Sequence, residues 1–339
     1  MRPPAARGAP KGFSGAREWA PDMPAVTLGV LGNLDYAREL GKKSTESDVQ
    51  LVTFKEGDTH VSMVVPFRHP EKVHPLCYAV NSADAILLVV KEVNRDLGES
   101  IVAAAAAGVS RGLIVLQNYV QPEQIAPLLK GTSLAGIPMT TDDKPANVRQ
   151  KIVELASPAR EGPVRIPIDH HFNVKGIGAV VLGFVKQGVV KKHDVLRAYP
   201  SAKTAQVRSI QVHDVDVSEA HTGDHVGLAL KNIENDDLDR GQVLAPEGSL
   251  TVAEPNTALQ LKCSVTPFFK PGIKNEGVYH LALGWQMVNA RAKAELGAGK
   301  EGAVQFELSA PLAYAPGERV VIVNLDNANQ RIVGYGIVG

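Results

Sequence analysis

The chain has 339 residues, and its 36 lysines and arginines equal its 36 aspartates and glutamates, so that its formal net charge is zero. A chain of this length can form two or three domains, each with its own core, but its balanced charge argues against a protein that coats nucleic acid by bulk attraction. Only Cys77 and Cys263 occur, which argues against a disulfide framework and predicts a protein of the reducing cytoplasm.

The first 22 residues are rich in proline, glycine, alanine and arginine and have no apolar periodicity. This composition is compatible with a transit peptide. The alternative is that residues 1–23 are a disordered tail or result from a start codon assigned too early, with Met23 as the true start. We favour this second interpretation.

Strands and helices are predicted to alternate over residues 24–157. Short apolar strands are predicted at residues 26–31, 49–54, 61–66, 85–90, 113–116 and 137–139. Helical spacing falls at residues 71–80, 98–107, 122–130 and 142–156, the last with Thr141 or Asp142 as its N-cap. Such alternation indicates a mainly parallel sheet covered on both faces by helices. The longest apolar run, residues 85–90, is far shorter than the roughly 20 residues of a membrane helix, so no membrane partner is expected.

Beyond a predicted linker at residues 158–163, the pattern consists only of strands and glycine-containing turns. The remaining length suits two small β-barrels, at residues 164–248 and 249–339, with a seam near residues 246–250. Glycines mark the bulges and corners of such barrels because glycine alone takes a positive φ without a Cβ clash.

Residues 165–244 carry the pattern I-D-x-x-F-x-V-x-G-x-G followed by a VRSIQVH segment at residues 207–213. This pattern resembles the second domain of the translational GTPases of the elongation factor Tu superfamily, and VRSIQVH resembles the SelB branch, the selenocysteine-specific elongation factors. The closing segment, with Pro316-Gly317-Glu318-Arg319, resembles the third domain. The resemblance implies an α/β GTPase-like domain of the P-loop NTPase type followed by two β-barrels.

In a GTPase the phosphate loop G-x-x-x-x-G-K-[ST] follows the first strand, and its lysine and hydroxyl bind phosphate and magnesium. The residues at that place begin with Gly32, but Ala37, Arg38 and Glu39 replace the second glycine, the lysine and the hydroxyl. A carboxylate beside the β-phosphate would repel it. A shifted frame, Gly41-Lys42-Lys43-Ser44, would place Tyr36 at the first glycine.

The other GTPase motifs are also altered. Of the D-x-x-G element and the histidine that follows it in this family, only His69 remains, and Gln117-Asn118-Tyr119-Val120 replaces the guanine-reading N-K-x-D. Only 33 positions separate Gly32 from Val65, which leaves no room for a full first switch. These losses predict a degenerate GTPase domain of the archaeal SelB-like group, without a nucleotide cofactor, a catalytic residue or GTP hydrolysis.

The resemblance also implies RNA-binding residues on the first barrel. Gln211 matches the position where the family presents a glutamate or glutamine under the terminal adenosine of tRNA, with Arg208 and His213 beside it. Asp169 and His170 lie near the position at which SelB-type factors hold the aminoacyl group. The alternative for His170 and His171 is structural, one histidine facing solvent and the other capping the barrel, because adjacent strand residues point to opposite faces.

Two weaker patterns carry alternatives. His69, His74 and Cys77 form H-x4-H-x2-C without a nearby fourth ligand, so we expect a packed helix rather than a zinc site. Seven lysines and arginines between residues 175 and 208 precede an acidic stretch at residues 214–239, and a barrel divided in this way could orient on a phosphate backbone.

The predicted function is that of a translation elongation factor-like protein that binds tRNA, an aminoacyl-tRNA or the ribosome without hydrolysing GTP. No DNA partner and no metal are expected. Two alternatives remain at this point: an active GTP-dependent elongation factor that delivers a specialised aminoacyl-tRNA, and a protein-protein scaffold that no longer binds RNA.

Overall fold

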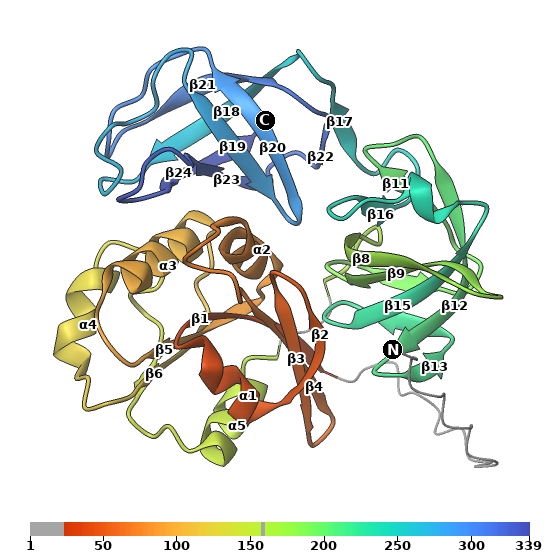
Figure 1. Cartoon of the computed structure of the whole chain (residues 1–339), viewed down its shortest axis with the longest axis horizontal. Coiled ribbons are helices and arrows are strands. Elements are labelled where there is room, and N and C mark those ends of the chain that lie inside the picture. The colour runs from red at the N-terminus through yellow and green to blue at the C-terminus, as the bar shows by residue number, and fades with distance from the viewer. Residues whose placement is uncertain (1–23, 157–159) are drawn as a thin grey trace, which may run out of the picture.

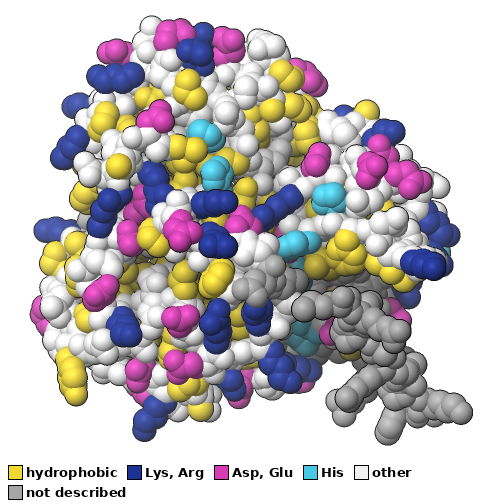
Figure 2. All heavy atoms as spheres, in the orientation of Figure 1, with side chains coloured by type: hydrophobic (Ala, Val, Ile, Leu, Met, Phe, Trp, Pro, Cys, Tyr) yellow, Lys and Arg dark blue, Asp and Glu magenta, His cyan; other side chains and the backbone are white. Residues whose placement is uncertain are grey.

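The computed structural model describes residues 24–156 and 160–339. An α/β domain packs beside one β-barrel and beneath a second, and each of the three units contacts the other two (Figure 1). On the face seen in Figure 2, basic and acidic side chains are intermixed, as the zero net charge would suggest. Within the described ranges no helix is both long and apolar enough to cross a membrane.

The α/β domain has a seven-stranded sheet in the order β2-β3-β4-β1-β5-β6-β7. Its strands are β1 Ala25–Gly32, β2 Lys42–Glu46, β3 Gln50–Glu56, β4 Thr59–Val65, β5 Ala85–Val90, β6 Gly112–Leu116 and β7 Met139–Thr140. Its helices are the 3-10 helix η1 Leu34–Tyr36, α1 Ala37–Leu40, α2 His74–Ser82, α3 Arg95–Ala106, α4 Pro122–Leu129 and α5 Pro145–Val153. The pairings from β4 through β7 are parallel, whereas β2 and β3 add antiparallel strands at one edge. The predicted, mainly parallel sheet is therefore confirmed.

Helices cover both faces of this sheet because its strands are apolar on both sides. One core lies between the sheet and α2, α3 and α4, and a second lies between the sheet and α1 and α5. The sequence did not predict β2 or α1. The predicted N-cap of the last helix is wrong, because α5 begins at Pro145 and Asp142 instead accepts a 2.7 Å bond from the Asn147 amide.

The first barrel is closed by a pairing between β11 and β12 at the ends of a sheet that runs β11-β16-β8-β9-β15-β12, with β13 beside β12. Its strands are β8 Ile166–Val174, β9 Gly178–Phe184, β10 Val189–Lys191, β11 Val195–Tyr199, β12 Thr204–Val212, β13 Val215–Val217, β14 Glu219–His221, β15 His225–Lys231 and β16 Val243–Ala245, with the 3-10 helix η2 Asn235–Asp237 before the last. Alternate residues along β12 are buried in the barrel core, so the intervening ones, including Gln211, face outward.

The second barrel closes in the order β18-β21-β20-β19-β23-β24 around its own core. Its elements are β17 Thr251–Ala253, β18 Ala258–Val265, β19 Val278–Leu283, β20 Gln286–Ala292, β21 Glu301–Leu308, β22 Leu312–Tyr314, β23 Arg319–Val323 and β24 Ile332–Val338, of which β17 and β22 form a separate pair. The predicted fold class, an α/β domain followed by two barrels, is confirmed.

The division of the first barrel into a basic and an acidic half is not maintained in space. Ion pairs join the two stretches, at 3.3 Å between Lys191 and Glu219 and at 3.3 Å between Lys203 and Asp237. Arg197 likewise pairs with Glu247 at 2.7 Å. Because opposite charges meet at these positions, the expected separation of charge across the barrel is wrong for these residues.

Candidate nucleic-acid interface

A row of outward-facing residues crosses the first barrel from β8 to β13. His170 pairs with Leu182, Leu182 with Gly227, Gly227 with Gln211, and Gln211 with Asp216. His170 and Gln211, both predicted from the sequence, therefore lie on one face, three strands apart. Strand spacing of about 4.8 Å puts them about 14 Å apart along the curved surface of the barrel.

Gly227 makes a shallow depression in the middle of this row. A Cβ placed on Gly227 would lie 3.5 Å from Leu182 Cδ2 and 3.9 Å from Gln211 Cβ, which is ordinary van der Waals contact. The missing side chain thus leaves a space bounded by an apolar group on one side and an amide-bearing side chain on the other. Such a space suits a flat ring, which could stack on the surface and bond to the amide.

Gln211 and Arg208 are both exposed. The Gln211 amide donates to Asp216 Oδ1 at 3.1 Å, and Arg208, at a β-bulge in β12, donates to the Ile177 carbonyl at 3.2 Å. The next row of the same face begins with Phe172, which is 42% exposed, and Ile177 at the nearby hairpin tip is 45% exposed. Sequence reasoning did not select these two apolar residues, although Phe172 is part of the glycine-rich pattern that defined the barrel.

Asp169 lies beneath this face and is fully buried. Its carboxylate accepts a 3.0 Å bond from Nδ1 of His170 and 3.3 Å bonds from Nε2 of His225. Burial alone would raise the pKa of Asp169, but the charge on His225 and the hydrogen bonds from both histidines hold it well below its usual range. The expectation that Asp169 contacts RNA is therefore corrected, because the buried carboxylate instead orients His170, whose side chain is partly exposed.

His213 lies at the boundary between the first barrel and the α/β domain. Its ring stacks on the ring of His60 from β4, with 4.4 Å between centroids, in the turn between β12 and β13. Burial, followed by the nearby charges of His225 and Lys55, lowers the pKa of His213, and burial lowers that of His60 to about 4. The ring of His213 thus packs against the neighbouring domain, and its contact with RNA stays a prediction.

The loop at the predicted phosphate-binding position is bonded to other segments of the α/β domain. Gly32 has a φ of +81°, and the backbone N–H of Asn33 donates to the Val89 carbonyl at 2.8 Å. The Asn33 side chain donates to Gln117 at 2.9 Å, and the buried Tyr36 donates its hydroxyl to the Asp143 carbonyl at 2.6 Å. An adjoining cavity of about 340 Å³ is lined by the carboxylates of Glu92 and Asp96 as well as by Lys91.

The three altered positions of the phosphate loop lie in the short helix α1. Ala37 is buried, and the Arg38 guanidinium lies 3.7 Å from Asp35 and 3.4 Å from the Gln50 side chain. Glu39 is exposed. Gly41, the start of the shifted frame, has an extended backbone and leads into β2 rather than into a helix. The shifted frame therefore lacks the helix N-terminus that a phosphate loop uses.

His69 lines the cavity beside the phosphate loop and contacts a buried carboxylate. The Nε2 atom of His69 lies 3.0 Å from the carboxylate of Glu99 in α3. The same carboxylate accepts three hydrogen bonds from Arg331 of the second barrel: one from its backbone N–H at 3.0 Å, one from Nε at 2.9 Å and one from NH2. Burial alone would raise the pKa of Glu99, but the bonds from His69 and Arg331 lower it to about 2. Sequence reasoning missed Glu99 and Arg331, because they are 232 residues apart.

The remaining members of the possible zinc pattern lie in α2. His74 packs edge-on against His280 of the second barrel, with 6.2 Å between ring centroids. Cys77 is buried, which raises the pKa of its thiol to about 12. Among the residues that the structure describes, no three or more histidine, cysteine or acidic side chains are grouped so that they could hold a metal ion.

A second set of contacts joins all three domains. Arg240 of the first barrel bonds to Asp48 of the α/β domain at 2.6 Å, and its guanidinium lies 4.7 Å from the ring centre of Tyr78 and 4.6 Å from that of Trp285 in the second barrel. The Trp285 indole also donates to the Ser82 hydroxyl at 2.7 Å. These contacts hold α2 against both barrels.

Comparisons with known proteins agree with this architecture. Residues 178–245 match the family Elongation factor Tu domain 2. An uncharacterized protein of Methanocaldococcus jannaschii is 36% identical over 93% of this chain and 99% of its own length. The selenocysteine-specific elongation factor of the same organism is 25% identical over 94% of this chain and 80% of its own length. The crystal structure of elongation factor SelB from Methanococcus maripaludis, in complex with the GTP analogue GppNHp, superposes with a TM-score of 0.79 and 24% identity over 94% of this chain and 79% of that one.

Proposed function

Because the chain belongs to the SelB-like branch of the elongation factor Tu family, we propose that this elongation factor-like protein binds tRNA, an aminoacyl-tRNA or the ribosome without hydrolysing GTP. The observation that carries the proposal is the outward row from His170 to Gln211, with its depression at Gly227. The row borders the contact between the α/β domain and the first barrel. The neighbouring pair on β15 and β9, His225 and Phe184, lies two residues farther along each strand, and Phe184 packs there against residues of the α/β domain.

The row has the chemistry that an unpaired RNA end requires. Gln211 offers a side-chain amide, Arg208 a guanidinium and Phe172 an exposed ring, all on strands of one rigid barrel. Unstacked bases bind to proteins by stacking on aromatic or planar side chains and by hydrogen bonds to their edges. His170, held by Asp169, can contact a group at the other end of the row.

The region around the phosphate loop supports the absence of a nucleotide cycle. Asn33 of the loop is bonded through its backbone N–H to Val89 and through its side chain to Gln117. Glu92 and Asp96 line the adjoining cavity, and carboxylates in a partly enclosed site repel phosphate. His69, at the position of the family's catalytic histidine, is bonded to Glu99.

The docking of the three domains also supports a function without a nucleotide switch. The Glu99–Arg331 and Asp48–Arg240 pairs join the α/β domain to one barrel each, and neither pair involves a nucleotide. A binding face that borders these contacts would keep one shape. We infer that the protein presents its RNA-binding face continuously rather than in response to GTP.

RNA crosslinking followed by sequencing tests the proposal. Cells expressing the tagged wild-type protein should yield enriched tRNA or ribosomal RNA, and Gln211→Ala should reduce that yield several-fold. Gln260→Ala is the matched control, because Gln260 is an exposed glutamine on a strand of the second barrel. A wild-type protein that enriches neither RNA would instead favour the scaffold function.

Binding of a fluorescent guanine nucleotide, with and without Mg²⁺, tests the absence of a nucleotide cycle. We expect no saturable binding at micromolar concentrations. Micromolar affinity that depends on Mg²⁺ and is lost in Arg38→Ala would contradict this expectation and favour an active GTP-dependent elongation factor.

A further inference from the structure

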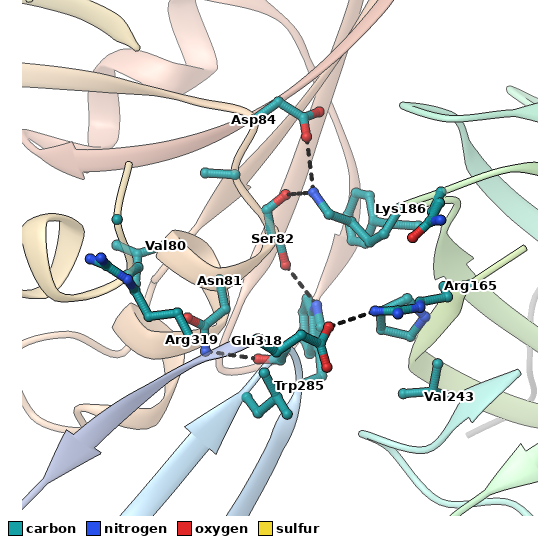
Figure 3. Close-up of a pocket in the computed structure, with 18 of the residues that line it drawn as sticks. Val80, Asn81, Ser82, Asp84, Arg165, Lys186, Val243, Trp285, Glu318 and Arg319 are labelled. Carbon is teal, nitrogen blue, oxygen red and sulfur yellow. Dashed lines mark hydrogen bonds and ion pairs between the residues drawn. The ribbon is translucent and has the colours of Figure 1, made fainter. Parts of the chain in front are cut away.

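A cavity of about 500 Å³ lies where the three domains meet (Figure 3). Phe184, two residues along β9 from Leu182 of the outward row, is among the residues that line it. The α/β domain contributes the end of α2 and the turn after α3, the first barrel contributes Arg165 and Lys186, and the second contributes Trp285, Glu318 and Arg319. This volume is within the range of about 300–1,000 Å³ that is typical of small-molecule sites.

The lining of the cavity is strongly basic, although the chain as a whole is neutral. Among the described residues that line it, five are cationic and two are acidic; they are Arg111, Arg160, Arg165, Lys186 and Arg319 against Asp84 and Glu318. The acids are already engaged, since Asp84 lies 3.0 Å from Lys186 and 3.2 Å from Arg160, and Glu318 lies 2.7 Å from Arg165. An excess of three positive charges therefore remains around the cavity.

The cations are held in place by the fold. Arg165 and Lys186 arise side by side on the first barrel, because the Lys186 N–H donates to the Arg165 carbonyl at 2.8 Å. Lys186 Nζ donates to the Ser82 carbonyl at 2.6 Å, and Arg319 NH1 donates to the Ala105 carbonyl at 3.3 Å. Figure 3 shows Arg165 and Lys186 reaching from the first barrel toward Glu318 and Asp84.

We propose that this cavity between the domains binds a small molecule that carries a chain of phosphate groups. A single phosphate monoester has a charge of about −1.5 to −2 at pH 7, so three excess positive charges suit more than one phosphate group. Arginine side chains form paired hydrogen bonds to phosphate oxygens, and lysine contributes a compact charge. This inference does not depend on RNA binding.

Such a ligand would contact all three domains at once. A molecule that binds only the assembled arrangement stabilises it by mass action. The midpoint of thermal unfolding should therefore rise with the concentration of the ligand. The effect should weaken as salt concentration increases, because the attraction is between charges in a cavity that is open to solvent.

Isothermal titration calorimetry of the full chain at low ionic strength, with inorganic tripolyphosphate and with ATP, tests the proposal. The variants Arg165→Gln and Glu318→Gln break the same ion pair, so their effects on folding should be similar, but they change the charge of the cavity in opposite directions. We expect Arg165→Gln to weaken binding about tenfold, which corresponds to the loss of one charge-assisted bond. Glu318→Gln should bind at least as tightly as the wild-type protein.

Lys130→Gln is the control, because Lys130 is exposed at the end of α4 and does not line the cavity. Its binding should equal that of the wild-type protein. Binding of both ligands would show that the phosphate chain suffices, and binding of ATP alone would identify nucleoside phosphates. The proposal is overturned if the wild-type protein binds neither ligand, if Arg165→Gln and Glu318→Gln weaken binding equally, or if Lys130→Gln weakens it as much as Arg165→Gln.

Discussion

Replacing Arg331 by leucine tests whether the buried pair with Glu99 locks the α/β domain to the second barrel. The Glu99 side chain is only 4% exposed, and the substitution removes its bonds from Nε and NH2 of Arg331. Removal of one partner from a buried ion pair costs about 3–5 kcal/mol. Glu99 keeps its bonds from His69 and from the backbone N–H of residue 331. We therefore expect a loss of free energy of unfolding at the lower end of this range, about 3 kcal/mol.

Trp285 offers a direct assay, because it lies in the contact of all three domains. The chain has two tryptophans, so a Trp19→Phe background leaves Trp285 as the only fluorescent indole. Urea denaturation followed by this fluorescence should give an earlier transition in Arg331→Leu. The free energy of that transition should fall by about 3 kcal/mol.

A double variant separates electrostatics from packing. In Glu99→Gln combined with Arg331→Leu no charge is left buried without its partner, so this protein should be more stable than Arg331→Leu alone. Equal or lower stability of the double variant would refute the reasoning. So would a Trp285 transition that Arg331→Leu leaves unchanged.

Three further predictions concern individual residues. Burial lowers the pKa of His60 to about 4. The contribution of neutral, buried His60 to stability is therefore fully present above its unfolded pKa of about 6.5 and is lost as the pH falls toward 4. A plot of the free energy of unfolding from pH 7 to 4 should be flatter for His60→Phe than for the wild-type protein, and an unchanged slope would contradict this. Gly227→Ala places its Cβ at ordinary contact distance from Leu182, so it should leave the unfolding temperature nearly unchanged but reduce RNA crosslinking, whereas unaltered crosslinking would argue against the depression as a base site. Tyr36→Phe removes a 2.6 Å bond to the Asp143 carbonyl and should lower the free energy of unfolding by about 1 kcal/mol. Urea denaturation measures this loss, and an unchanged free energy of unfolding would contradict the prediction.

The local pattern of the sequence predicted the elements that depend on near neighbours. Strand β5 was predicted at residues 85–90, and it is found as Ala85–Val90, because a continuous apolar run flanked by polar residues fits a strand buried on both faces. Gln211 was selected from the resemblance of the VRSIQVH segment, and it lies on the outer face of the barrel although a β-bulge interrupts the alternation in β12. Helix α1 and strand β2 escaped prediction because they are short, and their backbone bonds depend on β3 and the residues that flank them.

The candidate site was predictable only in part. Gln211 and Arg208 are exposed as expected, since both lie on an outward face. The burial of Asp169 and the stacking of His213 on His60 were not predicted, because their surroundings come from His225 and from another domain. Strand periodicity shows which face a residue takes, but it does not show whether another domain covers that face.

The sequence by itself determined the succession of an α/β domain and two barrels, and the departure of residues 32–39 from the pattern G-x-x-x-x-G-K-[ST], because both depend on residues close together in the chain. Only the tertiary structure decided that His69 contacts Glu99 and Arg331, and that cations from all three domains surround one cavity. These groups are up to hundreds of positions apart, and nothing in their local sequence encodes the contact. Domain packing brings them together, and it therefore decides which charges are buried, paired or left to attract a ligand.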